Sequence, residues 1–312
     1  MKKMSVPLIC IVGPTAVGKT AAAVDLALKL NAQIISCDSM LVYKEPRIIT
    51  AAPPPEALQA VPHHLIGIIS VTQDYNVFTY YQQAGAKIIE LLDKKVPAIV
   101  CGGTGLYFKA ILDGIFDDAG KDAGLRNDLE SEAQAQGVDK LYARLQSLDP
   151  EAAAKISPAD QRRIVRALEV YYASGKLISQ KKKESRGLWG KVPIKIFGFD
   201  LPRPRLYEII NQRVEQMWQA GAVEEVKELS KLELSPTAGK IIGIKEISSY
   251  LSGAWPKEQA IDEMKRNTRR LAKRQMTWFK ADKRLEWLDV DGLSAEQAAD
   301  VMFEKIKNVT FH

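Results

Sequence analysis

The sequence Leu8-Ile9-Cys10-Ile11-Val12 runs directly into Gly13-Pro14-Thr15-Ala16-Val17-Gly18-Lys19-Thr20. Five consecutive apolar residues predict a strand that is covered on both faces. The eight residues after it fit the pattern G-x-x-x-x-G-K-[ST], and the stretch Lys19–Leu30 has the apolar spacing of a helix. Strand, glycine loop and helix in this order predict a phosphate-binding loop (P-loop) at the edge of a parallel α/β sheet.

The chemistry of this loop follows from its residue types. Phosphate oxygens need converging donors, which the backbone N–H groups of a glycine loop and the following helix N-terminus supply. Lys19 is expected to place its charge on the terminal phosphate, and the Thr20 hydroxyl is expected to bind Mg²⁺. The predicted phosphate-binding set is Gly13, Pro14, Thr15, Ala16, Val17, Gly18, Lys19 and Thr20.

The rest of the chain continues the α/β pattern with one interruption. Further strands are predicted at Gln33–Cys37, Ala98–Cys101, Ile194–Phe199 and Leu285–Val290. Helices are predicted at Val77–Leu92, Leu125–Gln136, Asp139–Leu148, Pro158–Ala173, 204–230 and 256–281, with a short one inside 292–312. The sequence therefore predicts a P-loop NTPase-like core formed by 1–120 and 191–312, with an inserted helical domain at 121–190 and long C-terminal helices.

Composition excludes several classes of protein. With 312 residues, 46% hydrophobic and 26% charged, the chain can bury a sizeable core and is not of the disordered class. No apolar run approaches the roughly 20 residues that span a bilayer, so no membrane association is expected. Three cysteines without paired spacing support neither a disulfide framework nor a zinc site. We expect buried, reduced thiols in a cytoplasmic protein.

Charge is unevenly distributed along the chain. Residues 1–120 hold 10 basic and 10 acidic side chains, so the net charge of +6 lies in 121–312. The run 265–284 has 9 basic residues against a single acid, Asp282. This distribution favours chemistry in the first part and a polyanionic partner for the second, although such runs also occur as ordinary solvated surfaces.

Two further motifs follow predicted strands. Asp38-Ser39-Met40-Leu41-Val42-Tyr43 comes after the second strand and Gly102-Gly103-Thr104-Gly105-Leu106-Tyr107 after the third. The carboxyl ends of parallel strands meet at one edge, so both motifs are expected beside the phosphate loop. Asp38 there suits an Mg²⁺ ligand or a general base, or simply a helix N-cap. The glycines around Thr104 suggest backbone that passes close to a ligand.

Some conspicuous side chains are interpreted as structural. His63 and His64 have no carboxylate or cysteine at ligand spacing and are predicted to be hydrogen-bonded within a turn. Trp278 and Trp287 are predicted to belong to the core.

Six motifs in order carry a family resemblance. They are GPTAVGKT, DSMLVY, HHLI at 63–66, GGTGLY, DQRRIVRALE at 160–169 and LAKRQMTWF at 271–279. Together they resemble the bacterial tRNA dimethylallyltransferases (tRNA isopentenyltransferases), from about residue 6 to about residue 290. The resemblance implies transfer of a dimethylallyl group from dimethylallyl diphosphate to N6 of adenosine 37 in tRNA, with Mg²⁺ as cofactor. Without a sustained heptad pattern, the enzyme is expected to be a monomer.

The resemblance also implies residue roles. Asp38 would be the base, Thr104 would position the amine or the base, and Lys19 and Arg213 would hold the departing diphosphate. An adenine in an anticodon loop must leave its stack to react, and the inserted helices would clamp the anticodon stem. The implied tRNA-binding residues are Asp38, Ser39, Met40, Leu41, Thr104, Arg126, Gln161, Arg162, Arg163, Ile164, Val165, Lys240, Lys245, Arg270, Lys273 and Arg274.

Three other functions share parts of this pattern. A small-molecule or nucleotide kinase would use the same loop and the acid after the second strand, but no arginine-rich lid is evident. A non-catalytic RNA-binding ATPase would need an acid at the end of a hydrophobic strand, where this chain has Gly102 and Gly103. An enzyme that prenylates a free nucleotide would not need so basic a second half.

Overall fold

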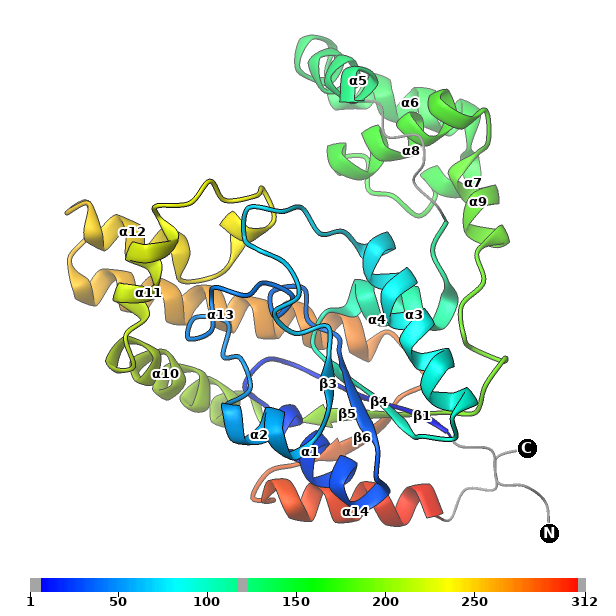
Figure 1. Cartoon of the computed structure of the whole chain (residues 1–312). Coiled ribbons are helices and arrows are strands. Elements are labelled where there is room, and N and C mark those ends of the chain that lie inside the picture. The colour runs from blue at the N-terminus through cyan, green and yellow to red at the C-terminus, as the bar shows by residue number, and fades with distance from the viewer. Residues whose placement is uncertain (1–6, 117–122, 308–312) are drawn as a thin grey trace. The chain divides into compact units, whose positions relative to one another are not determined.

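The computed structural model describes residues 7–116 and 123–307, and its elements are shown in Figure 1. The strands are β1 (Leu8–Val12), β2 (Gln33–Ser36), β3 (His63–His64), β4 (Ala98–Gly102), β5 (Ile194–Asp200) and β6 (Glu286–Asp289). The helices are α1 (Lys19–Leu30), α2 (Pro55–Ala60), α3 (Val77–Asp93), α4 (Gly105–Asp113), α5 (Ala123–Gln136), α6 (Val138–Leu148), α7 (Pro150–Ala153), α8 (Gln161–Ser174), α9 (Ile178–Glu184), α10 (Arg203–Gln219), α11 (Ala222–Leu229), α12 (Ile244–Leu251), α13 (Lys257–Lys280) and α14 (Ala295–Lys307), with a 3₁₀ turn at Ala238–Lys240.

The six strands form one parallel sheet in the order β3-β2-β4-β1-β5-β6. All five residues of β1 are buried, as expected for a strand covered on both faces. Ile9 and Ile11 belong to a core shared with α1 and α14, which lie together on one side of the sheet (Figure 1). The carboxyl ends of β1, β2 and β4 therefore meet at one edge, where the three motifs begin.

The predicted α/β fold is confirmed, and β1 and α1 have the predicted bounds. The single helix predicted over 204–230 is wrong, because Gly221 adopts a φ of +100° and separates α10 from α11. The turn predicted at His63 and His64 is instead the two-residue edge strand β3.

The chain divides into two compact units. An α/β unit contains the residues up to Lys109 and from Leu188 onward, and a helical unit contains Ala110–Gly187. The helical unit has its own apolar core, in which Leu141, Leu145 and Leu168 are at most 1% exposed.

The histidines and cysteines have structural surroundings. A ring nitrogen of His63 lies 2.7 Å from the Val61 carbonyl, and one of His64 lies 2.8 Å from the Gln33 side-chain oxygen. Within 7–116 and 123–307 there is no group of three or more His, Cys, Asp or Glu that could hold a metal. All three thiols are free and buried, and burial raises the pKa of Cys37 to about 12 and that of Cys101 to about 11. Among the described helices, none combines the length and apolarity needed to cross a bilayer.

Candidate active site and RNA-facing cations

The phosphate loop connects β1 to α1 and has the backbone that its glycines allow. Gly13 and Gly18 have φ values of +149° and +91°, and Ala16 between them has +69°. An added Cβ at Gly13 would lie 2.9 Å from the Phe199 carbonyl of β5, whereas Gly18 has no neighbour within 4 Å. Gly13 is therefore required by packing against the sheet, and Gly18 by its left-handed backbone.

The donors of this loop are available to a ligand. Among the described residues, the backbone N–H groups of Ala16 to Thr20 have no hydrogen-bond acceptor, which suits them to phosphate oxygens. The Lys19 side chain is only 8% exposed, and its Nζ donates to the Pro14 carbonyl at 2.6 Å. The pKa of Lys19 is lowered to about 8, chiefly by burial and in smaller part by the positive charge of Arg213, while the negative charge of Asp38 opposes the shift. The ammonium is thus held next to the loop at an electrostatic cost that an anion would relieve.

Hydrogen bonds connect the segment after β2, which carries Asp38, to the turn after β4, which carries Thr104. The Thr104 N–H donates to the Cys37 carbonyl at 3.0 Å, and Thr104 Oγ1 accepts the Ser39 N–H at 3.0 Å. Asp38 Oδ1 accepts the Met40 N–H at 2.9 Å. The Asp38 carboxylate is half-buried, and its second oxygen has no hydrogen-bond partner among the described residues. A carboxylate held by one oxygen, with the other free, can accept a proton from a substrate.

The glycines around Thr104 serve packing against the protein. An added Cβ at Gly102 would lie 2.2 Å from the Cys37 carbonyl oxygen, and one at Gly105 would lie 2.2 Å from Cδ1 of Trp278. The expectation that these glycines let the backbone approach a ligand is therefore corrected, because their close neighbours are Cys37, directly after β2, and helix α13.

Arg213 projects from α10 and is half-buried. Burial lowers its pKa, and the negative charge of Asp38 opposes the shift. Lys19, Asp38 and Arg213 therefore lie within electrostatic range of one another. With Thr104, these three make up the four predicted catalytic residues, and the structure brings all four to one edge of the sheet.

A divalent cation fits this edge. Mg²⁺ usually takes one or two protein ligands and fills its shell with phosphate oxygens and water. The exposed Thr20 hydroxyl has no hydrogen-bond partner among the described residues, and Asp38 offers a free carboxylate oxygen. A diphosphate in the loop would complete such a shell without an acidic cluster.

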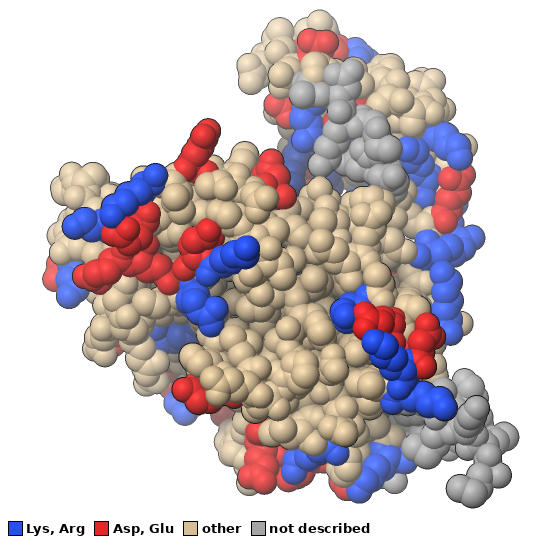
Figure 2. Space-filling model, viewed as in Figure 1, with Lys and Arg blue, Asp and Glu red and all other residues tan. Residues whose placement is uncertain are grey.

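The predicted RNA-binding cations of α13 are exposed. Arg270, Lys273 and Arg274 make no ion pair within the described ranges. Three other cations of the helix are paired with acids, in the Lys265–Glu215 and Arg266–Glu263 pairs at 2.7 Å and the Lys280–Asp200 pair at 3.4 Å. Figure 2 shows charges of both signs intermixed over α11 and α12, whereas Arg270, Lys273 and Arg274 of α13 have no acidic partner among the described residues.

Lys240 and Lys245 are exposed, and the segment that carries them is held in place by hydrogen bonds to Glu246. The buried carboxylate of Glu246 accepts the Gly243 N–H at 2.8 Å and the Asn267 side-chain amide of α13 at 2.7 Å. The two lysines are thereby attached to the helix that carries the other cations.

The helical unit carries the remaining predicted residues. The Glu169 carboxylate, 1% exposed, binds Arg126 at 2.7 Å and Arg166 at 2.8 Å. Gln161, Arg162 and Arg163 lie in the first turn of α8, with both arginines exposed.

Two residues of the predicted tRNA-binding set are corrected. Ile164 and Val165 are 0% and 2% exposed in the helical core, so their side chains cannot contact RNA. Ile164 and Leu168 are spaced by four residues on one face of α8, which is the sequence signal that identifies them as core.

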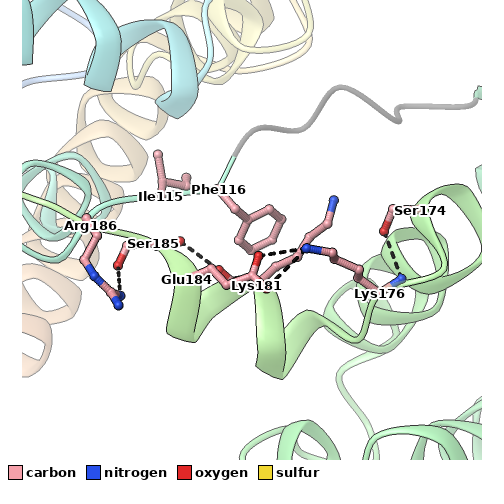
Figure 3. Close-up of a pocket in the computed structure, with 8 residues that line it drawn as sticks. All are labelled: Ile115, Phe116, Ser174, Lys176, Lys181, Glu184, Ser185 and Arg186. Carbon is pink, nitrogen blue, oxygen red and sulfur yellow. Dashed lines mark hydrogen bonds and ion pairs between the residues drawn. The ribbon is translucent and has the colours of Figure 1, made fainter.

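A pocket of about 480 Å³ lies within the helical unit (Figure 3). It is lined by Ile115, Phe116, Ser174, Lys176, Lys181, Glu184, Ser185 and Arg186. The Lys181 ammonium lies 5.6 Å from the centre of the Phe116 ring, and Lys176 pairs with Glu184 at 3.2 Å. With three cations against one acid, the lining favours an anion.

Two residues in 271–279 have roles at the site that sequence reasoning missed. Gln275 makes hydrogen bonds to the phosphate loop and to the glycine turn, and Trp278 packs on Gly105. Trp278 is 41% exposed, so its assignment to the core is wrong. Gln275 and Trp278 are about one helical turn apart, and this spacing is the only local signal that both contact the glycine turn after β4.

Comparison with known proteins identifies the family of this chain. A family model for IPP transferase matches residues 41–282, and one for isopentenyl transferase matches 6–73. The chain is 42% identical over 287 residues to the tRNA dimethylallyltransferase of Desulforudis audaxviator, covering 91% of this chain and 92% of the relative. It is 40% identical over 295 residues to that of Bacillus subtilis, covering 93% of each.

A solved structure has the same architecture. The full-length tRNA isopentenylpyrophosphate transferase of Bacillus halodurans is 36% identical, with a TM-score of 0.71 over 96% of each chain. The chain therefore belongs to the IPP transferase family, whose members here are tRNA dimethylallyltransferases.

Proposed function

We propose that this chain transfers the dimethylallyl group of dimethylallyl diphosphate to N6 of adenosine 37 in tRNA. The observation that carries the proposal is the convergence of a phosphate loop, a half-free carboxylate and two cations at one sheet edge, on a chain of this family. N6-(dimethylallyl)adenosine and diphosphate are the products.

The phosphate loop would bind a leaving group. The allylic C–O bond breaks and its electron pair leaves with the diphosphate, so negative charge increases on the phosphate oxygens. Lys19, Arg213 and the unpartnered N–H groups of Ala16 to Thr20 would stabilise that charge. Mg²⁺, held by Thr20, would supply further positive charge to the same oxygens.

Asp38 would accept the proton that N6 loses. The new C–N bond forms between N6 and the allylic carbon, which makes the amine acidic only as the bond develops. A carboxylate of ordinary basicity is therefore sufficient. Thr104 would hold the Asp38–Ser39 turn through its bond to the Ser39 N–H.

The tRNA would bind through the cations of both units. The exposed, unpaired cations of α13, together with Lys240 and Lys245, would contact the phosphate backbone. In the helical unit, Arg126, Gln161, Arg162 and Arg163 would contact the anticodon stem-loop, and the pocket beside Lys181 suits a phosphate. The helical unit would thus serve as the tRNA-clamping domain of a monomeric enzyme that acts in the cytoplasm.

The test is transfer of radiolabel from dimethylallyl diphosphate to an anticodon stem-loop with adenosine at position 37. The wild type should label this RNA with Mg²⁺ and without ATP, and should not label a stem-loop with guanosine 37 or free AMP. Asp38→Asn should lower the transfer rate about 10²–10⁴-fold. Asp93→Asn, at an exposed position that ends α3, is the matched control and should leave the rate unchanged.

Other outcomes separate the alternatives. Consumption of ATP without labelling of RNA would support the kinase. Labelling of AMP alone would support prenylation of a free nucleotide.

A further inference from the structure

The Gln275 side chain connects the two glycine-rich segments of the site. From α13, its Oε1 accepts the Thr15 N–H of the phosphate loop at 2.7 Å. Its Nε2 donates to the Gly103 carbonyl of the turn after β4 at 3.0 Å. Among the described residues, Thr15 has the only N–H from Thr15 to Thr20 with a hydrogen-bond acceptor.

The shape of the turn is matched to this amide. An added Cβ at Gly103 would lie 2.4 Å from Nε2 of Gln275, so no other residue leaves room for the contact. A side-chain amide has one donor end and one acceptor end, which is what a loop N–H and a turn carbonyl require together. Glutamate, lysine and methionine of similar length each lack at least one of these.

The two ends of Gln275 lead to the two substrates. Thr15 belongs to the loop that would hold the diphosphate. Gly103 precedes Thr104, whose hydroxyl accepts the Ser39 N–H beside Asp38. One turn further along α13, Trp278 packs on Gly105, so the helix contacts the turn on both sides of Thr104.

We propose that Gln275 is a positioning residue that sets the distance between the donor diphosphate and the Asp38–Thr104 acceptor site. This inference rests on the proposed function. Because Lys273 and Arg274 on the same helix would contact tRNA, binding of the acceptor would act on the helix that holds both loops. Transfer requires the reacting atoms at near-contact distance, where a displacement of about 1 Å costs about 10²-fold in rate.

Two substitutions test the proposal. Gln275→Met keeps the length and removes both hydrogen bonds. Gln275→Glu keeps the acceptor for Thr15 and places a carboxylate against the Gly103 carbonyl. Gln259→Glu makes the same change at an exposed position of α13 and is the control. For each we would measure single-turnover transfer at saturating substrates, equilibrium binding of the stem-loop, and thermal stability.

The expected result is a loss of rate without a loss of RNA binding. Both variants should fall about 10²-fold in single-turnover rate, with stem-loop affinity within about twofold of wild type. In Gln275→Glu, protonation of the new carboxyl group restores a donor toward Gly103. The ratio of variant to wild-type rate should therefore rise at least tenfold between about pH 8.5 and about pH 5.5. Taking the ratio cancels the titration of groups that both enzymes share, such as Lys19.

Two results would overturn the proposal. One is a single-turnover rate in Gln275→Met close to that of Gln259→Glu. The other is a loss that accompanies unfolding, with a rate ratio for Gln275→Glu that does not change with pH. Failure of the wild type to label the stem-loop would instead contradict the proposed function, so the two failures are distinct.

Discussion

The phosphate loop and the glycine turn around Thr104 follow adjacent parallel strands, yet their glycines have different causes. Gly18 has a left-handed backbone and open space where a side chain would be. Gly102 has no such backbone requirement, but the Cys37 carbonyl occupies the position of its Cβ. The first segment leaves room and free donors for a ligand, while the second is filled by the protein. Loss of a ligand donor in the first should therefore change function, and an added methyl group at Gly102 in the second should change stability.

The largest expected effect is a loss of transfer rate without a loss of stability when Lys19 in the phosphate loop is substituted. Lys19→Met removes a buried cation whose pKa burial lowers to about 8, and with it a ligand of the diphosphate. The transfer rate should fall about 10²–10³-fold while the free energy of unfolding stays equal or increases. Single-turnover transfer and urea unfolding measure the two quantities. A variant that unfolds easily would contradict this contrast.

The complementary change is Gly102→Ala in the glycine turn. The new methyl group would meet the Cys37 backbone at 2.2 Å, and backbone cannot rotate away as a side chain can. We expect a loss of about 3 kcal/mol in the free energy of unfolding. Urea titration of the variant beside Gly137→Ala, where no atom lies within 4 Å but φ is +89°, separates overlap from backbone strain. Equal losses in the two would argue against overlap as the cause.

The pH dependence of the KM for dimethylallyl diphosphate should also arise from one segment, the phosphate loop. The cationic form of Lys19 binds diphosphate, and with a pKa of about 8 in the free enzyme its cationic fraction falls as the pH rises. The KM for dimethylallyl diphosphate should rise about tenfold per pH unit above pH 8, and should be flat below it. The KM for RNA is the internal control. In Lys19→Met the donor KM should lose this dependence.

The smallest effect compares two neighbouring glycines. At Gly103 the added methyl group would meet the end of the Gln275 side chain at 2.4 Å, which can move. Gly103→Ala should cost about 1 kcal/mol, less than Gly102→Ala, because rotation of Gln275 relieves the overlap. The transfer rate of this variant should still fall, because the displaced Gln275 side chain no longer bridges Thr15 and Gly103. A stability loss as large as that of Gly102→Ala would show that the side chain is not free to move.

The parts of this molecule that could be predicted are those encoded by neighbouring residues. Continuous apolar runs define β1 and β4, and the spacing of apolar residues defines α1. The two-residue strand β3 is too short to show a period, and only Gly221 marks the break between α10 and α11. Local patterns are therefore sufficient for long elements and insufficient for short ones.

The functional site likewise combines features that local motifs predict with contacts between residues that are distant in sequence. The motifs place Lys19 and Asp38 at one sheet edge because parallel strands end together. The contact of Gly102 with Cys37 and the bridge from Gln275 to Thr15 depend on residues that are distant in sequence, so no local pattern reports them. The burial of Ile164 depends on the phase of α8 against its core, which a motif alone does not give.

The pairing of β1 with β5 has a consequence for biosynthesis. Leu8–Val12 aligns with Ile194–Gly198, and Gly13 packs on Phe199, so the phosphate loop lacks one wall until that strand is synthesised. At about 5–20 residues per second, the intervening chain takes about 10–40 s to translate. The helical unit, Ala110–Gly187, is continuous in sequence and is complete before then. One edge of β1 therefore lacks its β5 partner for that interval, although its other edge can already pair with β4.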